Sequence, residues 1–92
     1  MRKLKIGTRV YCLYKGSSVL EERVGYIGQT GFIIENLQDA KDYGNLEWSY
    51  NCYNKSWFTN SEKAKQKLKE IYKNLYGREG KVLDCGTWFT IK

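Results

Sequence analysis

Histidine and proline are absent from this chain of 92 residues, and cysteine occurs only three times. Without histidine the chain lacks the most common general base, the most common metal ligand and the Ser-His and Cys-His pairs of nucleophilic catalysis. The three cysteines are far apart and form no CxxC pair, so the sequence shows neither a zinc site nor a disulfide framework. Walker and dinucleotide-binding glycine motifs are absent as well. These absences predict a protein that is not an enzyme and that holds no metal or other cofactor.

A pair of carboxylates is the remaining route to acid–base catalysis. Asp39, Asp42 and Glu47 lie in or near one predicted loop, and we interpret them as solvated loop residues. Cys12 and Cys52 have apolar or aromatic neighbours, which is typical of a free cysteine that packs in a core. Neither group of residues therefore changes the prediction of a protein that is not an enzyme.

Long apolar runs are missing too, since no stretch approaches the roughly 18 residues of a membrane span. The charged start, residues 1–7, is not followed by the apolar segment of a secretory signal. A sparse and odd cysteine count is typical of a reducing compartment. We therefore expect a cytoplasmic protein of a bacterial host cell with no membrane partner, and the length predicts a single domain over residues 1–92.

Basic residues outnumber acidic ones by 16 to 10, which gives a net charge of +6. The surplus lies in residues 1–28 and 59–92, whereas residues 29–58 are mildly acidic. The lysines of the predicted helix spread around its whole polar arc, which is typical of a solvated face. The N-terminal basic residues are candidates for contacts with phosphate groups: Arg2, Lys3, Lys5, Arg9 and Lys15.

Aromatic residues make up 15% of the chain, more than a core of this size obviously needs. Four of them fall within ten residues and are candidate binding residues: Trp48, Tyr50, Tyr53 and Trp57. Alternation with period two places Trp48 and Tyr50 on one face of a strand. Some of the four must build the core, and the surplus predicts exposed rings. Exposed Tyr and Trp beside Arg are typical of protein-binding hot spots, and rings beside basic groups also stack on unpaired bases.

Strands are predicted where β-branched and aromatic residues cluster between glycine-containing turns. The predicted strands are residues 9–14, 22–27, 32–35, 46–50, 56–58, 81–83 and 87–91. Residues 36–45 contain Asp, Asn and Gly and are predicted to form a loop.

One amphipathic helix is predicted near residues 60–76, because its apolar residues fall in one stripe that should lie on the sheet. The stripe consists of Ala64, Leu68, Ile71, Tyr72 and Leu75. Thr59 and Glu62 fit a capping box at its start, and Gly77 fits a C-terminal cap.

The fold class that follows is α+β: a small, curled antiparallel sheet with one amphipathic helix, followed by C-terminal strands. The stretch 24–36 resembles the hairpin of an SH3-like barrel, because glycines separate its apolar pairs.

The segment 53–64 resembles small uncharacterised proteins of phages and prophages in Gram-positive bacteria. In those proteins a β-hairpin ends in Gly-Lys-Thr-Val-Phe, and Thr-x-Glu-Glu-Ala then opens a helix. The matching positions are Lys55, Phe58, Thr59, Glu62 and Ala64. This chain departs from the pattern at Asn54, where the pattern has Gly, at Trp57, where it has Val, and by one additional residue before Glu62.

The resemblance implies an accessory phage protein, a class whose small members include inhibitors of host defence. Together with the absence of catalytic motifs, it predicts a protein that binds a host protein or a protein–nucleic acid complex. Our first hypothesis is a protein inhibitor of a bacterial antiphage defence system, of the anti-CRISPR kind. A net charge of +6 argues against simple mimicry of nucleic acid, because such mimics are acidic. The alternative is a small basic module that binds DNA or RNA directly.

Overall fold

The computed structural model of this protein describes residues 4–14, 17–43 and 47–92. Three of the predicted phosphate-contacting residues, Arg2, Lys3 and Lys15, lie outside the described residues. Within the described part of the chain, no helix is long and apolar enough to cross a membrane.

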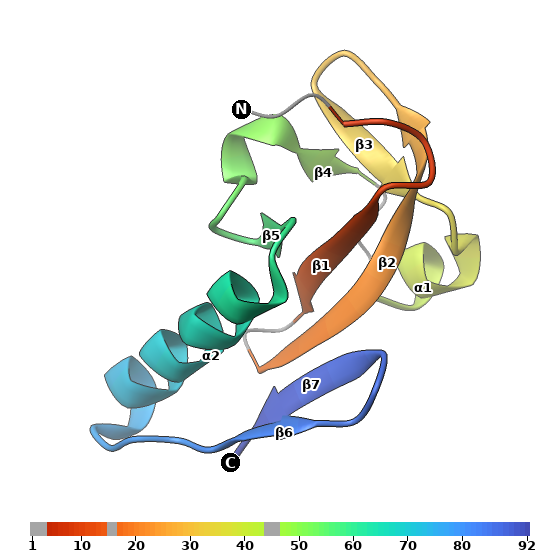
Figure 1. The fold of residues 1–92 in the computed structure, drawn as a ribbon. Helices are drawn as coiled ribbons and strands as arrows, with labels where there is room; N and C mark the ends of the chain where they lie inside the picture. Colours follow the sequence, from red (N-terminus) through yellow and green to blue (C-terminus); the bar gives the residue numbers. More distant parts are fainter. Residues whose placement is uncertain (1–3, 15–16, 44–46) are drawn as a thin grey trace.

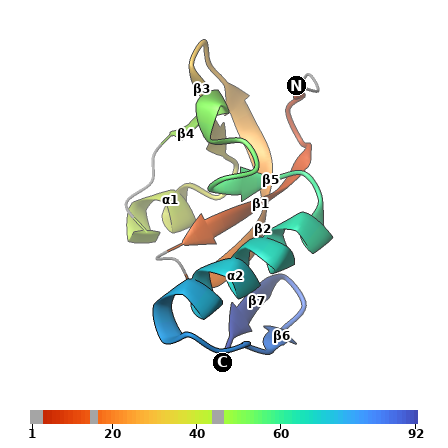
Figure 2. The same cartoon turned by 90° about the vertical axis from the view of Figure 1, so that its left-hand side faces the viewer.

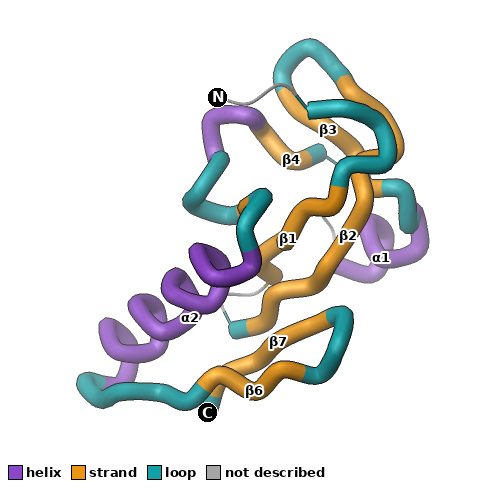
Figure 3. Tube along the Cα trace, in the orientation of Figure 1, coloured by secondary structure: helices purple, strands orange, loops and turns teal. Residues whose placement is uncertain are grey.

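The described residues form one curled antiparallel sheet and two helices (Figures 1 and 3). The elements in chain order are β1 (Arg9–Tyr14), β2 (Ser18–Ile27), β3 (Gly31–Ile34), α1 (Leu37–Tyr43), β4 (Trp48–Ser49), the short 3₁₀ helix η1 (Tyr50–Cys52), β5 (Trp57–Phe58), α2 (Ser61–Tyr76), β6 (Val82–Asp84) and β7 (Trp88–Ile91). The strand order is β4-β3-β2-β1-β5, and the hairpin β6–β7 joins the sheet through β7 on β2. The predicted α+β fold with a curled antiparallel sheet is confirmed.

Strand β2 is the centre of this sheet because it pairs with three other strands. It pairs with β1 over residues 18–23, with β7 over residues 18–20 and with β3 from Val24 onward. The register with β3 shifts between Val24 and Tyr26, which is a β-bulge, and such bulges bend a strand. A Cβ on Gly25 would lie 2.7 Å from the Cα of Glu35, so only glycine fits at this bend.

The alternation of side chains along β1 divides the core into two parts. The inner part is the inside of the curled sheet, where residues of β1 meet β3, β4 and β5: Val10, Cys12, Tyr14, Phe32, Trp48 and Trp57. The outer part lies between the sheet and α2: Val19, Phe58, Ala64, Leu68, Phe89 and Ile91. Figure 2 shows α2 lying across the outer face of β1 and β2, with β6 and β7 beside it. The central strands are therefore covered on both faces, which gives a small chain two hydrophobic clusters.

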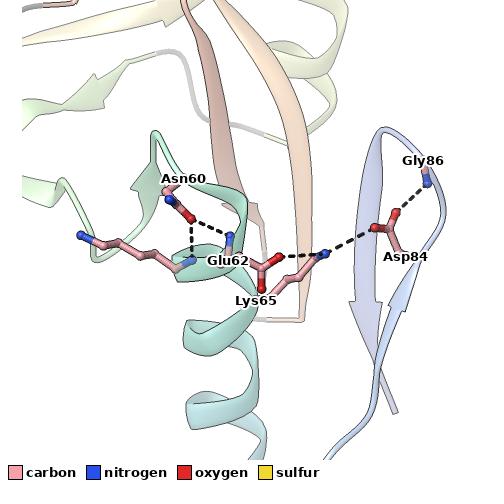
Figure 4. A network of polar contacts seen from close by, with 6 residues as sticks. Asn60, Glu62, Lys65, Asp84 and Gly86 are labelled. Carbon is pink, nitrogen blue, oxygen red and sulfur yellow. Dashed lines mark hydrogen bonds and ion pairs between the residues drawn. The ribbon is translucent and has the colours of Figure 1, made fainter.

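Helix α2 confirms the predicted helix, and Gly77 ends it with a left-handed φ of 70°. The predicted capping box on Thr59 is wrong, however. The cap is Asn60, whose side-chain Oδ1 accepts from the backbone N–H of Glu62 at 2.8 Å and of Lys63 at 3.3 Å (Figure 4). The backbone of Asn60 is extended just before the first helical residue, so its short amide reaches these donors. The Thr59 hydroxyl instead meets the hydroxyl of Tyr53 at 2.9 Å.

The apolar stripe of α2 is buried only along its first half. Ala64 and Leu68 are fully buried, Ile71 and Tyr72 are partly exposed, and Leu75 is 70% exposed. Figures 1 and 3 show the C-terminal end of α2 at the outside of the fold, away from β1. The prediction that Leu75 lies on the sheet is therefore wrong, because the helix is longer than the surface that it covers.

The predicted loop 36–45 contains the helix α1, which is a second correction. Asn36 starts this helix, because its side chain accepts from the backbone N–H of Asp39 and its carbonyl accepts from that of Ala40. Ala40 is buried against the inner core. Burial of the single small residue Ala40 thus attaches α1 to the core, although the polar composition of this segment is typical of a loop.

Of the predicted strand 46–50, residue 46 lies outside the described residues, and the strand present in the described part is β4, Trp48–Ser49. Tyr50 already belongs to η1, whose first turn is capped by Ser49, with its Oγ accepting from the N–H of Asn51 at 3.2 Å. The alternation that would place Trp48 and Tyr50 on one strand face therefore ends at Ser49.

The two candidate caps can be distinguished by mutation. We expect Asn60→Ala to lower the free energy of unfolding by about 1 kcal/mol, because two backbone donors lose their acceptor. Asn60→Asp should keep the stability, since its carboxylate accepts from the same donors and suits the helix N-terminus. Urea unfolding followed by circular dichroism measures both. An Asn60→Ala variant as stable as the wild type would show that Asn60 is not the cap.

Candidate functional site

Two of the four predicted aromatic binding residues are buried in the inner core. Trp57 is 0% exposed and Trp48 is 3% exposed. The Trp57 ring stands edge-on to Phe32 with 4.8 Å between centroids, and its Nε1 donates to the Ser49 carbonyl at 2.7 Å. The Trp48 ring stands edge-on to Tyr14 at 5.2 Å. Neither indole is accessible to a partner, so their prediction as binding residues is corrected by their burial.

Tyr50 and Tyr53 are half-buried, and their hydroxyls hold loops in place. The Tyr50 hydroxyl donates to the carbonyl of Gly28 at 2.8 Å, which ties η1 to the β2–β3 turn. The Tyr53 ring lies 4.8 Å from that of Trp57, and its hydroxyl meets Thr59. The four predicted rings thus have structural contacts of their own and do not form an exposed aromatic surface.

The predicted basic residues Lys5 and Arg9 are exposed and are joined by Arg23, which the sequence analysis did not select. Arg9 and Arg23 are direct cross-strand partners in β1 and β2. The Arg23 Nη1 donates to the carbonyl of Gly7 at 3.2 Å, which brings the segment before β1 against β2. The predicted strand begins at residue 22, whereas β2 begins at Ser18 and pairs with β1 from Tyr14 onward. A prediction with this earlier start would have set the register in which Arg9 and Arg23 are partners.

This N-terminal basic cluster of Lys5, Arg9 and Arg23 is interleaved with acidic side chains. The Arg9 Nε lies 3.7 Å from the Glu21 carboxylate. An open depression of about 360 Å³ next to it is lined by Glu21, Glu22, Arg23, Glu35 and Asn36. The surface around the cluster is therefore of mixed charge.

The depression reaches the buried carboxyl group of Glu22, which is only 5% exposed and points to the inner face of β2. The Tyr14 hydroxyl donates to its Oε2 at 3.4 Å. Burial raises the pKa of Glu22 to about 8, and a hydrogen bond and charge repulsion from Asp39 add to this, while the Tyr14 hydrogen bond opposes it. Glu22 is therefore mainly protonated at neutral pH and holds α1, through Asp39, against the sheet.

The three carboxylates considered as a catalytic group have separate partners. Asp39 faces Glu22 and is half-buried, so its interpretation as a solvated loop residue is corrected. Asp42 accepts from the Gln38 side chain at 2.8 Å, and Glu47 accepts from the Thr30 hydroxyl at 3.1 Å. In the described parts of the chain no group of three His, Cys, Asp or Glu side chains is placed to hold a metal ion.

Cys12 packs in the core as predicted and Cys52 is partly buried beside it, whereas the helix lysines Lys65 and Lys67 are only partly exposed. Cys12 is fully buried, and burial followed by the charge of Glu22 raises the pKa of its thiol, which keeps it protonated. On α2, Lys65 lies 3.6 Å from Glu62 and 3.4 Å from Asp84 (Figure 4). The pKa of Asp84 is lowered, mainly by a hydrogen bond from the backbone of Gly86 and also by Lys65. Two further pairs are Lys67–Glu70 within the helix and Lys73 with Glu79, which follows the helix.

The surplus of aromatic residues does produce exposed rings, but different ones from those predicted. The large apolar side chains that are exposed in the described residues are Ile6, Tyr26, Ile27, Leu37, Leu75, Tyr76 and Trp88. Their exposure depends on which other segments cover each element, and the sequence alone carries no signal for that.

No protein-family model, curated protein or solved structure matches this chain in comparisons with known proteins. The candidate surfaces are therefore interpreted from their own geometry.

The raised pKa of Glu22 predicts a pH dependence of stability. The folded state holds this proton up to about pH 8, whereas the unfolded chain releases it near 4.5, so stability falls as pH rises between these values. We expect Glu22→Gln to remove this loss, which is on the order of a few kcal/mol. Urea unfolding at about pH 5, 7 and 9 measures it, with the exposed Glu35→Gln as a control that keeps the wild-type slope. Parallel pH profiles of Glu22→Gln and the wild type would contradict the assignment.

Proposed function

We propose that this chain is a non-enzymatic accessory protein of phage type that binds a host protein and inhibits a bacterial antiphage defence system. The observation that carries the proposal is the combination of large exposed apolar side chains with basic residues of which four, on β1 and along α2, are paired with carboxylates of the chain itself.

The distribution of charge supports a protein partner over nucleic acid. A protein that binds nucleic acid through phosphates needs cations that are free to neutralise successive charges. Arg9, Lys65, Lys67 and Lys73 each lie within ion-pair distance of a carboxylate of this chain. A phosphate backbone would have to displace these carboxylates and would meet them as repulsive neighbours.

The exposed side chains support the same partner class. Tyrosine and arginine are enriched in protein interfaces and dominate their binding energy, whereas lysine and glutamate are depleted. Two segments of this surface carry an exposed tyrosine within three residues of an arginine: Arg23 and Tyr26 on β2, and Tyr76 with Arg78 just after α2.

The defence system as target follows from the resemblance of residues 53–64 to phage proteins and from the small size of the chain. Because the net charge is +6, the chain is repelled by the basic grooves with which defence proteins bind nucleic acid. Its charge instead suits an acidic surface of the target. Inhibition then follows from blocking a movement or an assembly step at that surface.

A small nucleic-acid-binding module is the second candidate, and the N-terminal basic cluster favours it. Lys5, Arg9 and Arg23 lie near one another, and the exposed Tyr26 follows on the same strand as Arg23. These groups offer phosphate contacts and one stacking ring.

The two candidates are tested in parallel. We expect bacteria with an active CRISPR system to become sensitive to a targeted phage when they produce the wild-type chain, which a plaque assay measures as efficiency of plating. A strain without the defence system serves as the control, and plating there should not change. Unchanged immunity, repeated with restriction-based and other defence systems, would reject the inhibitor.

Fluorescence anisotropy with labelled DNA and RNA tests the second candidate. A nucleic-acid module should bind at about 50 mM salt and lose affinity by orders of magnitude by about 200 mM. We expect no tight, salt-sensitive binding. Tight binding that Arg9→Ala and Arg23→Ala weaken would make the nucleic-acid module the correct function.

A further inference from the structure

The last turn of α2 and the residues after it form a distinct surface, the helix-end patch, which consists of Tyr72, Leu75, Tyr76 and Arg78. Leu75 is 70% exposed and Tyr76 is 62% exposed. Tyr72 is partly exposed and precedes Leu75 by three residues and Tyr76 by four, which makes both of them its neighbours on the helix surface. Contiguous exposed apolar side chains of this kind mark interaction sites.

Contacts within the helix-end patch hold its side chains in place. The rings of Tyr72 and Tyr76 lie 4.6 Å apart between centroids. The Arg78 Nη2 donates to the Tyr72 hydroxyl at 3.2 Å, and its guanidinium lies 5.9 Å from the Tyr72 ring centroid. The left-handed turn at Gly77 directs the chain back so that Arg78 reaches the helix.

The Tyr72 ring also packs closely against the backbone at Gly80. A Cβ on Gly80 would lie 2.7 Å from a ring carbon of Tyr72 and 2.8 Å from the side chain of Ile91, so the chain after α2 passes close to this ring. A surface whose side chains are already ordered loses less entropy on binding, which favours affinity.

The charge around the helix-end patch is positive. Lys73 is paired with Glu79 at 3.3 Å. Among the described residues, Lys69, Arg78 and Lys81 have no carboxylate within ion-pair distance. Lys69 lies one turn before Tyr72 on the same helix, and Lys81 follows Gly80. Charge complementarity therefore selects an occupant with acidic groups around an apolar centre.

We propose that the helix-end patch is the docking site for an acidic surface of the partner protein. The partner's carboxylates lie opposite Arg78, Lys69 and Lys81, and an apolar side chain of the partner covers Leu75 and Tyr76. This site rests on the proposed function, whose target it describes further. Nucleic acid fits it less well, because its most exposed apolar side chain is the aliphatic Leu75, on which a base does not stack, and the two tyrosine rings are tilted against each other by 47°.

The double variant Leu75→Ser/Tyr76→Ser tests the site in the plaque assay. Both residues are exposed, so the fold should persist, which circular dichroism checks. We expect inhibition to fall by roughly tenfold or more, as for the loss of interface hot spots. The matched control is Leu37→Ser on α1, an apolar residue that is 65% exposed and lies outside the patch, which should inhibit like the wild type. A double variant that inhibits like the wild type overturns the site.

A direct binding experiment separates this site from the proposed function. The isotope-labelled full chain is titrated in NMR with a synthetic peptide of Asp, Glu and Leu residues and, separately, with single-stranded oligothymidylate. We expect the peptide to shift the amide signals of residues 69–81 and the double variant to lose these shifts. Shifts centred on the N-terminal basic cluster, or tighter binding of the oligonucleotide to residues 69–81, would overturn the proposal. A wild type that fails in the plaque assay but binds the peptide at residues 69–81 would reject the inhibitor and keep the site.

Discussion

The indole of Trp57 closes the curled sheet, and the rest of the fold depends on this closure. Strands β4 and β5 are the two ends of the strand order, and each has only two residues, too few for a stable ladder of their own. The hydrogen bond from Trp57 to the Ser49 carbonyl joins these ends, and η1 carries the chain between them (Figure 1). Because the ring also fills the space next to Phe32, the inner face of the sheet becomes a closed core.

Closure of the inner core determines which surfaces remain for a partner. The large rings of residues 48–57 are used to build and tie the interior, so they are not available outside. The outer face of β1 and β2 is covered by α2, β6 and β7. Four of the exposed apolar side chains lie where elements extend past this packing: Leu75 and Tyr76 at the C-terminal end of α2, and Tyr26 and Ile27 on β2.

The pairing of charges on the surface determines where positive charge remains available to the proposed partner. Pairing with carboxylates reduces the effective charge of Arg9 and of three helix lysines, and it leaves the end of α2 as a positively charged apolar surface. Inside the sheet, Glu22 stays protonated because burial and Asp39 oppose its ionisation. The carboxyl pair thus connects α1 to the sheet, and the proposed docking surface lies at the other helix, α2.

Local patterns in the sequence were sufficient to predict β1 and α2. The cluster of β-forming residues at 9–14, the apolar period of residues 61–76 and Gly77 each act within a few residues of the chain. The sequence likewise determined the net charge and the absence of histidine. Non-local contacts decided the rest: Ala40 docks a helix where composition predicted a loop, Trp57 turns inward to close the sheet, and Arg23 meets Arg9 through the register of β1 and β2. Burial of a ring, the pKa of a carboxyl and the exposure of Leu75 depend on which other segment covers them, and only the tertiary structure supplies that neighbour.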